Sequence, residues 1–216
     1  MSKENEEQNI DNIKITFGAF STNKNNEEKS LNSLIKVFNE SSESSEINIT
    51  NKIQYEFTHK ILSENGNKFS CKNIFLELNN TSKNSKINDL IDCYIIFFDL
   101  ENSDSLIELD KILHYLNAID ISYRKIYLIN FFFDKNNVQS NLTEDNINLY
   151  FDKYQIENYD ISDIDLTESN NELVKIIDSI SIEMLEDKGL IIDGVIIKGN
   201  NNFLNDEKDR SKCLIF

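Results

Sequence analysis

The chain has 216 residues and a formal net charge of −16, so it is long enough for one ordinary domain with its own core. The acidity excludes the usual nucleic-acid-binding classes, because phosphate contacts need clustered Lys and Arg. No apolar run is long enough to cross a bilayer. The three cysteines, Cys71, Cys93 and Cys213, lack metal-site spacing and fit a reduced cytosolic compartment.

The first half of the chain predicts a strand, a helix and a hairpin. Residues 1–11 are polar and are expected to be a disordered acidic N-terminus rather than a signal peptide. Residues 13–17 predict a strand, and the apolar spacing over 31–38 predicts a helix. Residues 41–51, rich in Ser, Glu and Asn, are expected to be a loop. A hairpin is then expected over 53–78, with an Asn-Gly turn between its strands.

The second half alternates strands and helices. Residues 93–98 form a continuous apolar run, which is typical of a strand covered on both faces. A similar signal predicts a strand at 126–131, and a shorter one predicts a strand at 158–161. Helices are predicted at 103–116, 143–154 and 169–185. This alternation predicts an α/β fold with a mainly parallel sheet, helices on both faces and one antiparallel edge strand.

The order of these elements resembles the Ras superfamily of small GTPases. Residues 92–106 look like the fourth strand of that family and the helix after it, and 142–145 are similar to the Val-Thr-Glu-Glu that begins its next helix. Residues 159–173 run without a gap along the segment around the family's guanine-binding Ser-Ala-Lys loop. The resemblance implies a P-loop NTPase-like, Ras-like domain over residues 12–186, followed by a hypervariable tail at 187–216.

The phosphate-binding residues that this resemblance implies are degraded. The family's G-x-x-x-x-G-K-[S/T] loop holds phosphates on backbone N–H groups, which its glycines leave accessible. Gly18, expected at the end of the first strand, and Lys29-Ser30, expected at a helix start, are vestiges of that motif. Ten residues separate Gly18 from Lys29 where the motif allows five, and Glu28 replaces the second glycine. Lys29 and Ser30 either still bind phosphate and Mg²⁺ or only begin the helix.

The guanine-binding residues are degraded as well. Asn130 and Asp134 are vestiges of the N-K-x-D motif, but the lysine is lost and the spacing is one residue too long. Residues 77–80 replace D-x-x-G without a glycine, and residues 163–165 replace Ser-Ala-Lys. Because all four sites fail together, we expect no catalytic residue, no metal and no bound GTP or GDP.

Two features near the expected base site leave alternatives open. If the strand ends near Asn130, Phe131-Phe132-Phe133 either fill the vacated base pocket or form a docking patch. The acidic residues between 160 and 168 form either a site for a divalent metal or a solvated loop. The apolar segment 189–199 either packs on the domain or binds a partner.

The last four residues, Cys213-Leu214-Ile215-Phe216, match the C-a-a-X signature for prenylation of Cys213, with a geranylgeranyl chain favoured over farnesyl. The basic residues Lys208, Arg210 and Lys212 are diluted by acidic ones. One isoprenoid with so weak a basic patch gives modest, reversible membrane binding. We therefore expect the protein at the cytoplasmic face of the plasma membrane or an endomembrane, with a cytosolic pool.

The leading hypothesis is a prenylated, Ras-like pseudo-GTPase that contacts effector or scaffold proteins and has an impaired or lost nucleotide cycle. One alternative is a divergent, working GTPase that binds GTP, GDP and Mg²⁺ through an unusual phosphate loop. Another is a scaffold that does not bind membranes, similar to the pseudo-GTPase centromere protein M.

Overall fold

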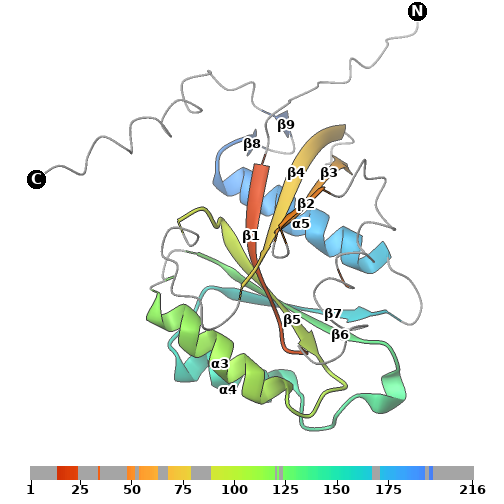
Figure 1. Cartoon of the computed structure of the whole chain (residues 1–216), viewed down its shortest axis with the longest axis vertical. Helices are drawn as coiled ribbons and strands as arrows, with labels where there is room; N and C mark the ends of the chain where they lie inside the picture. Colours follow the sequence, from red (N-terminus) through yellow and green to blue (C-terminus); the bar gives the residue numbers. More distant parts are fainter. Residues whose placement is uncertain are drawn as a thin grey trace, which may run out of the picture.

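Within the described residues, the computed structural model contains one large sheet and a small hairpin (Figure 1). It describes residues 14–23, 34, 48–51, 54–62, 68–78, 89–119, 121, 124–166, 171–192 and 195–196. The large sheet has seven strands in the order β2-β3-β4-β1-β5-β6-β7. Their bounds are β1 (Lys14–Ser21), β2 (Asn48–Asn51), β3 (Gln54–Leu62), β4 (Lys68–Glu77), β5 (Cys93–Asp99), β6 (Ile126–Phe132) and β7 (Tyr159–Asp165).

Parallel pairing dominates this sheet. β4, β1, β5, β6 and β7 are parallel to one another, which confirms the mainly parallel α/β architecture. β3 is antiparallel to β4, and β2 is antiparallel to β3. The prediction of one antiparallel edge strand is wrong in one respect, because β3 lies inside the sheet and β2 forms the edge. β2 falls in the segment 41–51, for which composition predicts a loop; two of its four residues are β-branched, and pairing with β3 outweighs the Asn and Ser around them.

Helices cover both faces of the sheet, as predicted (Figure 1). α3 (Ser105–Ala118) and α4 (Glu144–Lys153) lie on one face, and α5 (Asn171–Asp187) lies on the other. A short 3-10 helix, η2 (Lys135–Asn137), follows β6. The expected start of α4 is confirmed, because the Thr143 hydroxyl caps the helix by accepting a hydrogen bond from the N–H of Asn146.

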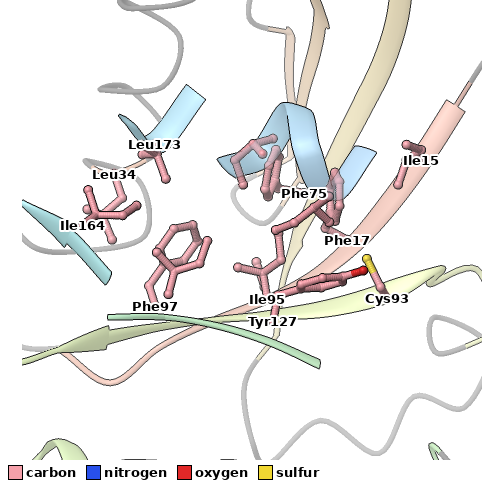
Figure 2. Close-up of a cluster of buried hydrophobic side chains, with 14 of the residues drawn as sticks. Ile15, Phe17, Leu34, Phe75, Cys93, Ile95, Phe97, Tyr127, Ile164 and Leu173 are labelled. Carbon is pink, nitrogen blue, oxygen red and sulfur yellow. The ribbon is translucent and has the colours of Figure 1, made fainter. Parts of the chain in front are cut away.

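Each face of the sheet has its own hydrophobic core. The side chains of β5 alternate between them: Cys93, Ile95 and Phe97 belong to the α5 core, and Tyr94, Ile96 and Phe98 to the core under α3 and α4. Figure 2 shows part of the α5 core, where Leu34 lies beside Ile164 and Leu173, and where the rings of Phe17 from β1 and Phe75 from β4 stack on each other. Leu34 is helical and lies on the same side of the sheet as α5, and the other residues of the helix expected over 31–38 lie outside the described residues.

Four strands extend beyond their predicted ends. β1 reaches Ser21 rather than residue 17, β5 reaches Asp99, β6 reaches Phe132, and β7 reaches Asp165. The sequence predicts an earlier end for β5 and β7 because acidic residues follow the apolar ones there. In the fold, the extra residues remain paired in the parallel ladder.

The folded chain continues past the predicted domain end at residue 186. α5 runs to Asp187 and is closed by Gly189, which has a φ of +66° and donates to the carbonyl of Glu186, while the N–H of Leu190 donates to the carbonyl of Leu185. Leu190 packs against the α5 core. The strands β8 (Ile191–Ile192) and β9 (Val195–Ile196) then pair as a hairpin, so at least the start of the segment 189–199 packs on the domain.

Candidate functional site at the carboxyl ends of the strands

The topology predicts a binding crevice at the carboxyl ends of β1 and β5. Leu34, in the helix after β1, lies in the α5 core, whereas α3, which follows β5, covers the opposite face. In open α/β sheets, ligands bind where successive connections leave in opposite directions, outside the carboxyl ends of the strands. The residues at the ends of β1 and β5 are therefore the first candidates for a binding site.

These strand ends are joined by a closed ring of three hydrogen bonds. The N–H of Asp99 donates to Thr22 Oγ1 at 3.0 Å, and Ser105 Oγ donates to the carbonyl of Asp99 at 2.6 Å. Because the Ser105 proton is used there, the Thr22 hydroxyl is the donor in the 3.1 Å contact between Thr22 and Ser105. All three residues are buried, so the ring fixes the β1 end, the β5 end and the start of α3 as one unit.

The Asp99 carboxylate completes this network. It has no exposed surface, yet its Oδ2 accepts from Asn23 Nδ2 at 2.6 Å and its Oδ1 accepts from the N–H of Glu101 at 2.9 Å. A buried carboxylate is tolerated only where hydrogen bonds replace its lost hydration. The network therefore buries an acidic side chain at this edge of the sheet, and the polar groups of Thr22, Asn23 and Ser105 are used in internal hydrogen bonds.

Gly18 does not lie at this edge. It is inside β1, three residues before its end, so its expected position at the strand end is wrong. A Cβ at Gly18 would lie 2.7 Å from a ring carbon of Tyr94 and 2.9 Å from Ile91 Cδ1. The missing side chain therefore makes room for a core aromatic ring. Lys29 and Ser30 lie outside the described residues.

Asn130 and Asp134 have separate environments. Asn130 lies inside β6, is 4% exposed, and donates from Nδ2 to Asp163 Oδ1 at 2.7 Å. Its Oδ1 has no hydrogen-bond partner among the described residues. Asp134 caps η2: its carboxylate accepts from the N–H and Nδ2 of Asn136 and from Nδ2 of Asn137. The Asp134 side chain thus stabilises its own loop.

Glu101 is a site residue that the sequence gives no reason to select. Its carboxylate accepts the N–H groups of Phe133 and Asp134 at 3.1 and 3.0 Å. The N–H of Gln139 donates to the carbonyl of Leu100 in the same region. These contacts attach the loop after β6 to the loop after β5, where the resemblance implies a guanine-binding loop.

The aromatic triplet after Asn130 belongs to both cores. β6 ends at Phe132, so the first two rings belong to the strand and only Phe133 follows it. Phe131 is buried in the α5 core and meets Phe133 edge-on at a centroid distance of 5.9 Å. Phe132 is partly buried against the opposite core. The three rings therefore do not form one exposed patch, and they do not fill one pocket together.

The acidic residues of β7 do not form one cluster. Side chains alternate along a strand, so Asp160 lies on the α5 side, where it pairs with Lys125, while Asp163 lies on the opposite side against Asn130. No group of three or more His, Cys, Asp or Glu side chains in the described ranges is placed to hold a metal ion. Glu168 lies outside those ranges.

The two described cysteines are packing residues. Cys71 and Cys93 are free thiols buried in the α5 core. Burial raises the pKa of Cys71 to about 12 and raises the pKa of Cys93 well above its usual range. A thiol that stays protonated is a poor nucleophile, so neither cysteine provides a catalytic centre. Cys213 lies outside the described residues.

Comparisons with known proteins give no family. No protein-family model matches the sequence, and no curated protein matches it. Among the described helices, none has the length and apolar composition needed to cross a membrane.

Proposed function

We propose that this chain is a Ras-like pseudo-GTPase that acts through protein contacts and has an impaired or lost nucleotide cycle. The sheet supports a Ras-like origin: five parallel strands have an antiparallel strand beside β4, and helices cover both faces. That arrangement is the one that the resemblance in element order implies.

The observation that carries the loss of nucleotide binding is the buried Asp99 network. A polyphosphate at the carboxyl ends of β1 and β5 would meet a desolvated carboxylate, and like charges repel strongly where water is excluded. Among the described residues, the Asn23 amide and the N–H of Glu101 are two donors at this edge that are already in use, because both bind Asp99. Between Gly18 and Gly189 the sequence has only one glycine, Gly66, so a glycine-rich phosphate cradle cannot be formed there.

The same network suggests how the protein works without a ligand. In a nucleotide switch, loops are ordered by the γ-phosphate and Mg²⁺ and are released on hydrolysis. Here Glu101 and the Asp99 ring fix the described loops after β1, β5 and β6 by internal hydrogen bonds. A surface held in one state suits a scaffold or adaptor that is regulated by its partners or by its location.

Calorimetric titration of the purified full-length protein with GDP and GTP, in the presence of Mg²⁺, tests this proposal. We expect no saturable heat and no thermal stabilisation. A working GTPase would instead be stabilised by about 2.7 kcal/mol when GDP is present at a hundred times its Kd. Lys29→Ala is the matched control, because in a working phosphate loop it would abolish that stabilisation. Micromolar binding that Lys29→Ala removes would overturn the proposal.

Membrane attachment through Cys213 is the second part of the proposal. The C-a-a-X ending supports it. Fractionation of cells that express the protein or Cys213→Ser tests it: we expect the unaltered protein to divide between membrane and cytosol, and the variant to be cytosolic. Equal fractionation of the two proteins would support a scaffold that does not bind membranes.

A further inference from the structure

β7 forms one edge of the large sheet, and its ladder bonds go only to β6. The carbonyl of Asn158 accepts from the N–H of Ile126, and the N–H of Leu166 donates to the carbonyl of Phe132. In a parallel ladder the N–H and C=O of one residue point to the same side, and successive residues alternate. Asn158 and Leu166, which flank β7, both have even numbers. The backbone N–H and C=O groups of the even-numbered residues of β7 therefore point toward β6, and those of the odd-numbered residues point outward.

The outward backbone groups are those of Tyr159, Ile161 and Asp163. Among the described residues, none forms a hydrogen bond with these backbone groups. The strand is also accessible between Tyr159 and Asp163. Asp160 and Asp163 are exposed, the other three residues of this stretch are half-buried, and the next residue, Ile164, is buried. An accessible edge of this kind can accept a further strand.

The surroundings of this edge are acidic. Glu144 and Asp152 are exposed on α4, the helix that packs over β7 through the stacked rings of Phe151 and Tyr159. Both carboxylates lie close enough to add to the effect of burial in raising the pKa of Tyr159. Lys153 faces the other way, toward Asp110 on α3. A strand added to β7 would therefore lie in a negative field.

We propose that the edge of β7 from Tyr159 to Asp163 binds an extended basic peptide of a partner protein as an additional strand. Backbone hydrogen bonds would provide affinity, and Lys or Arg side chains of the peptide would face Asp163 and the acidic side of α4. A second copy of this chain is disfavoured, because pairing β7 with itself brings its aspartates close to their copies. The proposal does not depend on whether nucleotide binding has been lost.

Amide hydrogen exchange of the full chain, followed by NMR, tests the proposal. The probe is a synthetic peptide of about nine residues with alternating Lys and Val, long enough to pair along the strand. We expect added peptide to slow exchange at the odd amides 159, 161 and 163. The even amides 160, 162 and 164 already bond to β6 and should not change. A peptide with Glu in place of Lys is the charge control, and it should have no effect.

A pair of variants distinguishes the contribution of the Asp163 backbone N–H to peptide binding from that of its side chain. Asp163→Pro removes an outward N–H without removing a bond to β6, whereas Asp163→Ala loses the same carboxylate but keeps the N–H. We expect Asp163→Pro to weaken peptide binding at least about tenfold relative to Asp163→Ala. If the proline variant does not fold, the difference in exchange between the odd and even amides of β7 in the unaltered protein still tests the proposal.

Several results would overturn the proposal. One is the absence of any exchange difference between odd and even amides with the Lys peptide, and another is equal binding by the two variants. A third is strong protection of the odd amides in the free protein. Protection that depends on protein concentration would identify a second copy as the occupant, and protection that does not would identify another segment of this chain.

Discussion

Removing the Asp99 carboxylate should destabilise the fold more than any exposed carboxylate does. Asp99→Ala leaves two buried donors without an acceptor: Asn23 Nδ2, now 2.6 Å from the carboxylate, and the N–H of Glu101, at 2.9 Å. Each such donor costs about 1–3 kcal/mol, so we expect a loss of about 2–6 kcal/mol in the free energy of unfolding. Asp99→Asn keeps the shape and one oxygen acceptor, so its loss should be about half as large.

Urea unfolding followed by far-UV circular dichroism measures these losses. Asp134→Ala is the matched control, because that carboxylate also accepts several hydrogen bonds but lies on an accessible loop. Its cost should stay below about 1 kcal/mol, the usual effect of losing a cap. If Asp99→Ala costs no more than Asp134→Ala, the network at the carboxyl ends of β1 and β5 is not the buried, paired unit described above.

Three further predictions concern the core and the helices. Gly18→Ala should cost about 1–3 kcal/mol in urea unfolding, because its Cβ would overlap the Tyr94 ring; an unchanged midpoint would contradict the close packing. Thr143→Ala should lower stability by about 0.5–2 kcal/mol through loss of the α4 cap, measured by thermal melting, and an unchanged melting temperature would argue against the cap. Cys71 and Cys93 should resist iodoacetamide in the native protein at mildly alkaline pH and react in urea, because burial keeps both thiols protonated. Mass spectrometry of the alkylated peptides checks this, and rapid native modification would contradict the burial.

The central part of the fold could be predicted because its signals are local. The uninterrupted apolar run of β5 indicates a strand buried on both faces, and the two cores receive its alternate side chains. The helix start at Thr143 is another local signal, since a hydroxyl before acidic residues is typical of a cap. Strand ends were harder to predict: β1 continues through Ser21, which pairs with Phe97 of β5, and the next residue, Thr22, meets polar partners from β5 and α3.

The candidate site depended on contacts between distant residues, so the sequence predicted little of it. Asn23 and Asp99 are separated by 76 positions, and nothing near either one indicates the pairing. A charged residue directly after six apolar ones was a usable signal that Asp99 is buried. Gly18 was selected by its motif position, but its reason for being glycine is a ring at Tyr94, which only the register of β1 with β5 brings opposite it. Glu101 gave no signal, because its partners are backbone N–H groups.

Native mass spectrometry of the protein purified from the cells that make it, under gentle conditions with Mg²⁺ present, tests the central claim most directly. We expect one mass without nucleotide, increased by a single isoprenoid and reduced by the last three residues. A mass that includes a guanine nucleotide and Mg²⁺, and that falls by the same amount on denaturation, would contradict the claim.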